Sequence, residues 1–238
     1  MKHIHVISTT ILGGLAFALC PVKAAPQAPL TVVELFQSQG CSSCPPANAN
    51  VMALSDRPDL LTLSFGVTYW DQLGWKDTFA SPQYTARQWD YAHGLHHSNV
   101  YTPQVIVNGR ADITGTDKTE LESLIRREAN LIAPPVEINA GQAHVGEDVT
   151  IRMTIGKGVR YDVWLVRFDP RIENVPIARG ENGGLTLPHR NVVKQLVKLG
   201  AWSGAAVDFP LPPATQAGLK DAVLVQKGPG GAIVAAAR

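Results

Sequence analysis

Two nearly continuous apolar runs stand out early in the chain, at residues 31–36 and 60–67. The first is rich in β-branched side chains, and both runs are typical of strands that a parallel sheet buries on both faces. A helical pattern follows each run, at 47–54 and at 81–94. Prolines lie where a first helical turn tolerates them, so we predict two strand-to-helix units in succession.

A hairpin and a third helix complete this part of the chain. Asn108-Gly109 separates two short apolar runs, and this dipeptide accepts the positive φ angles of a tight turn. Asp117 with Glu120 then predicts a helix start. The order strand, helix, strand, helix, hairpin, helix is that of a thioredoxin-like domain.

The texture of the chain changes after a proline-rich stretch at 133–135. Apolar and polar residues alternate over 149–155, as in a half-solvated strand. Further strands are predicted at 161–168, 191–197 and 222–225. We therefore predict an α/β protein with a thioredoxin-like domain at 25–133, its central mixed sheet flanked by helices, and a smaller mostly-β domain at 134–238.

The first 24 residues are predicted to be an export signal. Lys2 supplies a positive end, residues 6–19 are apolar, and 22–24 offer small residues for cleavage. The apolar run is shorter than the roughly 20 residues that cross a bilayer. We expect a periplasmic or secreted protein that begins near Ala25 and has no integral membrane segment once the signal is removed.

Composition narrows the classes of partner. The 238-residue chain is 45% hydrophobic, enough for a substantial core, and its 21 basic and 20 acidic residues give a formal net charge of +1. Such a balance creates no long-range field that would attract nucleic acid or an anionic membrane. We expect neither as a partner.

The candidate chemistry centres on Cys41-Ser42-Ser43-Cys44, at the first strand-to-helix junction. Signal cleavage would remove Cys20 and leave these two cysteines in a compartment where disulfides persist. So small a loop restrains the unfolded chain little, which favours a chemical use. A helix N-terminus stabilises a thiolate, so we expect a more exposed Cys41 as nucleophile and Cys44 as resolving cysteine.

This interpretation predicts a thiol:disulfide oxidoreductase that acts on protein or peptide thiols and disulfides. Its redox-active disulfide would take the place of a separate cofactor. An alternative is a copper or zinc module formed by Cys41, Cys44 and His96, although the second cysteine pair of many zinc sites is absent. A second alternative is a non-catalytic interaction protein whose disulfide only braces a loop.

Glu34 lies within the apolar first strand, where an ionised carboxylate is unfavourable unless it is paired. One interpretation is a buried proton acceptor behind the cysteines that serves Cys44 during resolution. The other is a strand-end residue that reaches water or a lysine.

Three further residues are candidates for substrate binding. Thr102-Pro103 precedes the hairpin, where thioredoxin-like proteins carry a cis-proline that faces the cysteines and exposes backbone to an extended substrate. The competing interpretation is an ordinary trans turn. Trp70, with Trp75 in the same aromatic loop, could line a partner surface or pack the seam between two domains. His189 is interpreted as a structural histidine.

Several motifs together resemble a secreted bacterial family, the domain of unknown function 1223. They are residues 33–36, 38–47, 69–71, 73–75, 87–88, 100–104, 181–183 and 189–193. The resemblance covers nearly the whole mature chain and implies a thioredoxin-like domain joined to a β-rich one. Gly40 and Ser42-Ser43 depart from the residues of thioredoxin itself, which leaves open whether a membrane partner would donate or accept electrons.

Overall fold

The structure is a computed structural model that describes residues 29–129, 132–139, 141–147 and 160–238. The predicted export signal at 1–24 and the predicted strand at 149–155 lie outside the described residues. Within the described part of the chain, no helix is both long and apolar enough to cross a membrane.

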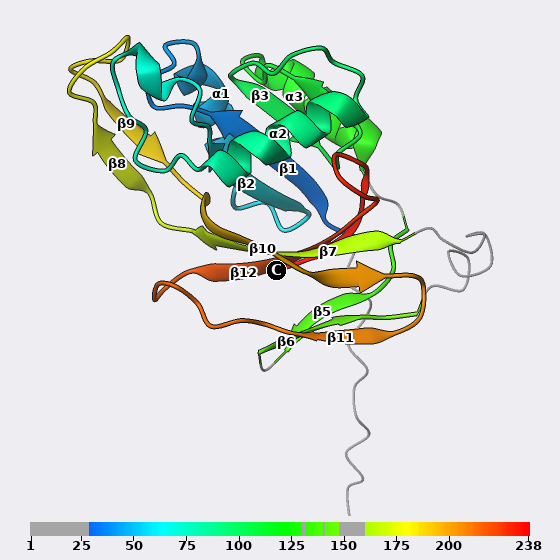
Figure 1. Cartoon of the computed structure of the whole chain (residues 1–238). Helices are drawn as coiled ribbons and strands as arrows, with labels where there is room; N and C mark the ends of the chain where they lie inside the picture. Colours follow the sequence, from blue (N-terminus) through cyan, green and yellow to red (C-terminus); the bar gives the residue numbers. More distant parts are fainter. Residues whose placement is uncertain (1–28, 130–131, 140, 148–159) are drawn as a thin grey trace, which may run out of the picture.

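One eight-stranded mixed sheet organises the molecule (Figure 1). Its strands lie in the order β13-β12-β7-β10-β2-β1-β3-β4. Their bounds are β1 Thr31–Gln37, β2 Leu60–Gly66, β3 Gln104–Val107, β4 Ala111–Ile113, β7 Tyr161–Asp169, β10 Val192–Trp202, β12 Lys220–Gln226 and β13 Ile233–Ala237. β1 is parallel to β2 and antiparallel to β3, and both β1 and β2 are buried along their whole length, as their apolar sequences predict.

Three helices flank the sheet, α1 (Cys44–Ala53), α2 (Pro82–Gly94) and α3 (Lys118–Glu128). α1 and α3 pack on the face of β1 that carries Val33 and Leu35, whereas α2 packs on the face that carries Val32 and Phe36. The predicted start of α3 is confirmed, since the Asp117 side chain accepts a hydrogen bond from the Glu120 N–H. The predicted order of elements up to α3 is therefore confirmed.

The Asn108-Gly109 turn between β3 and β4 is also as predicted. Its two residues have φ angles of 47° and 62°. The buried Asn108 side chain accepts a hydrogen bond from the Val32 N–H at 2.8 Å and donates one to the Glu128 carbonyl at 2.8 Å. Through these two hydrogen bonds, the Asn108 side chain holds β1 and the C-terminal end of α3 together.

Two smaller antiparallel sheets complete the fold of the described residues. One has the order β11-β6-β5 and the other pairs β8 with β9. Their bounds are β5 Val136–Asn139, β6 Gln142–Val145, β8 Glu173–Pro176, β9 Thr186–His189 and β11 Val207–Pro210. The predicted fold class is confirmed as a mixed α/β protein, with a large mixed sheet flanked by helices and smaller antiparallel sheets beside it.

The large sheet runs across the predicted domain boundary at 133. β10 lies next to β2, with Val192 paired to Ser64 in parallel. Asn191, at a φ of 53°, donates its side-chain amide to the Thr62 carbonyl at 3.0 Å and to the Thr62 hydroxyl at 2.7 Å. Both parts of the chain therefore contribute strands to one sheet, and β9 lies beside α1 (Figure 1).

Glu34 is fully buried on the α2 face of β1. Its carboxylate accepts a hydrogen bond from Arg87 Nε at 2.8 Å and another from the Tyr91 hydroxyl. Arg87 also donates to the Gln226 side chain at 3.1 Å. Since α1 packs on the opposite face, the structure does not bring Glu34 together with the cysteine pair. Its partner is an arginine of α2 and not the predicted water or lysine.

We expect Glu34→Gln to lower the free energy of unfolding by about 3–5 kcal/mol, because it leaves the buried Arg87 guanidinium without a counter-charge. Urea denaturation measures the loss. Asp59→Asn is the control, since its partner Arg57 is 42% exposed and such pairs contribute under about 1 kcal/mol. Similar losses in the two variants would contradict the expectation.

Candidate functional site

The two cysteines form a disulfide at the N-terminus of α1, with their Cα atoms 5.4 Å apart. Cys44 is the first residue of the helix and Ser43 is its N-cap. No side chain caps this helix end. Its first residue, Cys44, donates its N–H to the Cys41 carbonyl at 3.2 Å, and Pro45 and Pro46 have no N–H, so the positive end of the helix faces the cysteine loop, residues 38–43. The Ser43 hydroxyl lies 3.3 Å from Cys41 Sγ. This geometry suits a sulfur that becomes a thiolate on reduction.

The prediction that Cys41 is the more exposed cysteine is wrong. The relative exposure is 0% for Cys41 and 1% for Cys44. Residues 177–185, which connect β8 to β9 and are called the cap loop below, bind directly to the cysteine loop. The buried Asn182 side chain donates to the carbonyls of Gln39 and Cys41, both at 2.9 Å. A segment 141 residues further along the chain thus lies against Cys41.

The cap loop makes a second polar contact through Glu181. One oxygen of its carboxylate accepts hydrogen bonds from the Ser42 N–H at 3.1 Å and from the Ser42 hydroxyl at 2.7 Å. These bonds lower the pKa of the Glu181 carboxyl. Glu181 is exposed, so the carboxylate lies at the surface directly above the cysteine motif.

Trp75, more than Trp70, contacts the cysteine loop. Trp75 Nε1 donates to the Gln39 side-chain oxygen at 2.9 Å. A Cβ atom added at Gly180 in the cap loop would lie 3.2 Å from Trp75 Cβ, so the indole is close to the cap loop as well. Trp70 is half-buried and packs against the core on the α2 face, which includes Phe168 of β7. That position agrees with the packing interpretation.

Asp77 is a site residue that the sequence analysis did not find. Its carboxylate accepts hydrogen bonds from the Gln39 N–H and from the Phe79 N–H, both at 2.7 Å. Burial raises the pKa of this carboxyl to about 6, and the neighbouring Asp71 carboxylate acts in the same direction. The sequence shows only an aspartate in a polar loop, and such aspartates are usually surface residues, so nothing in the sequence identifies Asp77 as buried.

The Thr102-Pro103 peptide bond is cis, as predicted. β3 begins at the next residue, and Gln104 pairs with Phe36 in β1. The bond therefore lies at the end of the sheet where β1 leads into the cysteine loop. The Thr102 hydroxyl is buried and has no hydrogen-bond partner among the described residues.

The residues of the alternative metal site are not brought together. Among the residues that the structure describes, no three His, Cys, Asp or Glu side chains form a group that could hold a metal ion. His96 is exposed in the turn after α2, with a φ of 63°. Its neighbour His97 pairs with Asp112 at 2.8 Å. A copper or zinc site from Cys41, Cys44 and His96 is therefore not formed.

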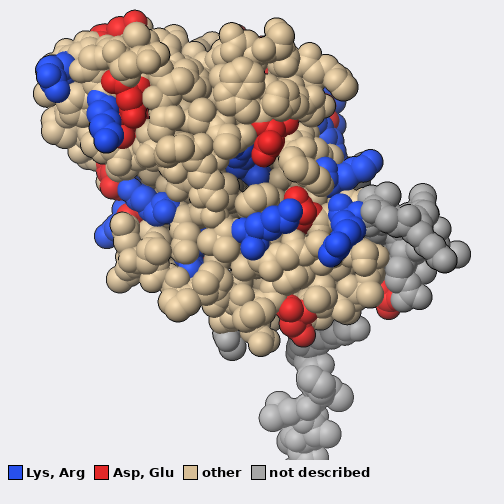
Figure 2. Space-filling model, viewed as in Figure 1, with Lys and Arg blue, Asp and Glu red and all other residues tan. Residues whose placement is uncertain are grey.

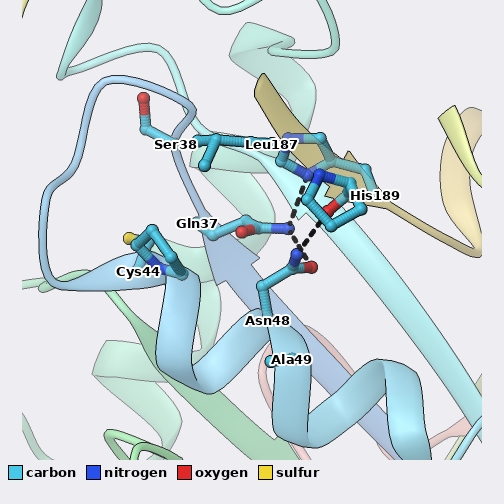
Figure 3. Close-up of a pocket in the computed structure, with 9 residues that line it drawn as sticks. Gln37, Ser38, Cys44, Asn48, Ala49, Leu187 and His189 are labelled. Atoms are coloured by element: carbon cyan, nitrogen blue, oxygen red, sulfur yellow. Dashed lines mark hydrogen bonds between the residues drawn. The ribbon is translucent and has the colours of Figure 1, made fainter. Parts of the chain in front are cut away.

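A cavity of about 220 Å³ lies beside the first turn of α1 (Figure 3). It is lined by Gln37, Ser38, Cys44, Pro45, Asn48, Ala49, Leu187, Pro188 and His189. Gln37 donates its side-chain amide to Asn48 at 3.1 Å, and Asn48 donates to the Pro188 carbonyl at 2.6 Å. These bonds connect the end of β1, helix α1 and strand β9 along one wall of the cavity.

His189 is buried at the edge of this cavity. Burial lowers the pKa of its imidazole to about 4, and the charge of Lys194 acts in the same direction, so the ring is neutral near pH 7. Gln37 Nε2 lies 3.3 Å from Nδ1, and an amide nitrogen can only donate there. The proton is therefore assigned to Nε2, which has no hydrogen-bond partner among the described groups.

Fold and site together define a mixed α/β protein with a disulfide between the first residue of a helix and the loop before it, closed over by a distant loop. The chain belongs to the family described as Protein of unknown function (DUF1223), whose family model matches residues 32–226. The predicted membership of the domain of unknown function 1223 is thereby confirmed. No curated protein matches the chain.

Two solved structures are similar to this one. A crystal structure of a protein from Agrobacterium tumefaciens is 32% identical, with a TM-score of 0.73, and the match covers 90% of this chain and 95% of that one. HBP35 of Porphyromonas gingivalis is 11% identical, with a TM-score of 0.56, over 88% of this chain and 74% of that one. The second likeness concerns the fold alone.

Asp77 and His189 should give opposite pH dependences of stability. The pKa of Asp77 is raised from 3.8 to about 6 in the folded protein, so its contribution to stability is complete below pH 3.8 and is lost as the pH rises through 6. The pKa of His189 is lowered from 6.5 to about 4, so its contribution is complete above pH 6.5 and is lost as the pH falls through 4.

We therefore expect Asp77→Asn to make acidification from pH 6.5 to 4 more destabilising than in the wild type, by about 3 kcal/mol at most. His189→Gln should change the slope in the opposite direction, because it leaves the proton uptake of Asp77 unopposed. Urea titrations at a series of pH values measure both slopes. Curves that run parallel to that of the wild type would show that neither group titrates as described.

Proposed function

We propose that the protein is an exported, thioredoxin-like thiol:disulfide oxidoreductase that acts on protein or peptide disulfides through Cys41 and Cys44. The observation that carries the proposal is the disulfide at the uncapped N-terminus of α1, with the Ser43 hydroxyl 3.3 Å from Cys41 Sγ. After reduction, the helix end and this hydroxyl would both stabilise a thiolate at Cys41.

The reaction exchanges one disulfide for another. In the reducing direction, the Cys41 thiolate attacks a substrate disulfide and forms a mixed disulfide, and one substrate sulfur leaves as a thiolate that takes up a proton. Cys44 then loses its proton and attacks Cys41 Sγ, which restores the Cys41–Cys44 disulfide and releases the second substrate thiol. The two electrons pass from the dithiol to the substrate, and the opposite direction reverses each step.

Access to Cys41 sets the conditions for this exchange. Because Cys41 is fully buried beneath the cap loop, a substrate disulfide reaches its sulfur only when the contacts of Asn182 and Glu181 open. Two apolar side chains are exposed near the cap loop: Leu73, at the end of a short 3-10 helix (Asp71–Leu73), at 52%, and Leu185, at the end of the cap loop, at 51%. They offer apolar contact area to a partner.

Charge favours a protein or peptide as the partner. Basic and acidic side chains are interspersed on the face seen in Figure 2, and the net charge is +1. Such a surface offers a nucleic acid little electrostatic attraction. Thr102 and Pro103 remain proposed substrate contacts, and the cis peptide bond just before β3, opposite the end of β1, supports them. We infer export from the predicted signal at 1–24. A membrane protein is the proposed donor or acceptor of the electrons.

Replacement of the resolving cysteine tests the proposal. In Cys44→Ala, the mixed disulfide on Cys41 has no internal thiol to release it, so adducts with cellular proteins should accumulate. Non-reducing gels and mass spectrometry after acid quenching detect these adducts, and reduction with dithiothreitol should abolish them.

Cys41→Ala is the matched control, since it removes the proposed nucleophile and keeps one cysteine. It should form few adducts. Equal adduct formation in both variants would contradict the assignment of Cys41, and an absence of adducts in both would contradict thiol:disulfide exchange with proteins.

A further inference from the structure

We infer that Glu181 biases the direction of electron flow: by placing a carboxylate on the residue after Cys41, it disfavours the Cys41 thiolate and makes the reduced protein a better donor of electrons. The inference rests on the proposed function and deepens it. Glu181 is a positioning residue that acts through Ser42 and not on the substrate.

The carboxylate of Glu181 is fixed over the cysteine motif by two of its own hydrogen bonds and by its neighbour. Ser42 donates both its N–H, at 3.1 Å, and its hydroxyl, at 2.7 Å, to the same oxygen. Asn182 is only 3% exposed and binds the carbonyls on either side of Gly40. An exposed glutamate is thus held in one place by a buried anchor.

The path of the cap loop allows this close approach. Gly180 has a φ of 81°, and a Cβ atom there would lie 3.2 Å from Trp75 Cβ. A side chain at Gly180 would therefore be strained and would also displace Trp75. The loop can bring Glu181 onto Ser42 because a glycine precedes it.

Glu181 competes with the thiolate for the same stabilising groups. Ser42 lies next to Cys41 and just before the N-cap Ser43, and the carboxylate already accepts both its N–H and its hydroxyl. A carboxylate next to a thiolate also raises the pKa of the thiol by like-charge repulsion. The buried Asp77 carboxyl, bound to the Gln39 N–H, acts in the same direction once it is ionised.

Destabilising the thiolate shifts the equilibrium toward the disulfide. A strongly oxidising pair is one whose reduced form is stabilised, and Glu181 has the opposite effect. The reduced protein therefore tends to give up its two electrons: the Cys41 and Cys44 thiols become a disulfide, and one substrate disulfide becomes two thiols. A dithiol donor must then reduce Cys41–Cys44 again, which identifies the partner class as disulfide-containing proteins on one side and a dithiol protein on the other.

Glu181→Gln tests the inference, because it keeps an oxygen that can accept from Ser42 and removes the charge. Equilibration of the full-length protein with mixtures of reduced and oxidised glutathione gives the constant for reduction of Cys41–Cys44. We expect this constant to favour the dithiol by roughly twofold to fivefold more than in the wild type. The rate of Cys41 alkylation against pH should show a lower thiol pKa.

Two controls separate charge from structure. Glu137→Gln changes another exposed glutamate, on β5, and should leave both measurements unchanged. In 1 M salt, where the screening length is about 3 Å, the difference between wild type and Glu181→Gln should shrink. An unchanged glutathione constant in Glu181→Gln, with a wild-type disulfide that exchanges normally, would overturn the inference alone. A wild-type disulfide that exchanges with no thiol would overturn the proposed function and the inference with it.

Discussion

The amide of Asn182 is the contact on which the arrangement of the site depends. It satisfies two backbone carbonyls of the cysteine loop with one buried side chain. A buried carbonyl that loses its partner destabilises the folded protein by about 1–3 kcal/mol. The contacts of this single amide are therefore a sizeable fraction of the roughly 5–15 kcal/mol that stabilise a typical domain. It holds the cap loop beside the buried Cys41, next to the Glu181 carboxylate that binds Ser42.

The cap loop can reach the cysteines because the large sheet is built from both ends of the chain. β10 extends the sheet beyond β2, and the β8–β9 hairpin precedes β10 in the sequence. His189, at the end of β9, then lies at the cavity beside α1. The β-rich part of the chain therefore supplies one wall of the site, which is more than a separate covering domain would do.

Local patterns were sufficient to predict much of the fold. Asn108-Gly109 and Asp117 gave the hairpin and the start of α3, because each acts on backbone within a few residues. The disulfide at a strand-to-helix junction also follows from adjacent residues. Asp77 and Asn182 were not found, because their roles arise from contacts with Gln39, which lies far from both in the sequence.

Glu34 also shows that a local sequence pattern does not identify a partner that lies far away in the sequence. Its place in an apolar strand correctly indicated a buried charge, but only the packing of α2 shows that Arg87 neutralises it. Side chains along β1 alternate between the two faces of the sheet, so Glu34 points to the face that α2 covers and not to the face that α1 covers. A sequence pattern gives the alternation, but it does not say which helix covers which face.

The separation of 141 residues between Cys41 and Asn182 has a consequence for how the protein is made. A ribosome produces both cysteines well before the segment that covers them. During this interval the thiols are open to any oxidant in their surroundings. In any chain that ends before the cap loop, the cysteine pair therefore lacks the cover that Asn182 and Glu181 provide.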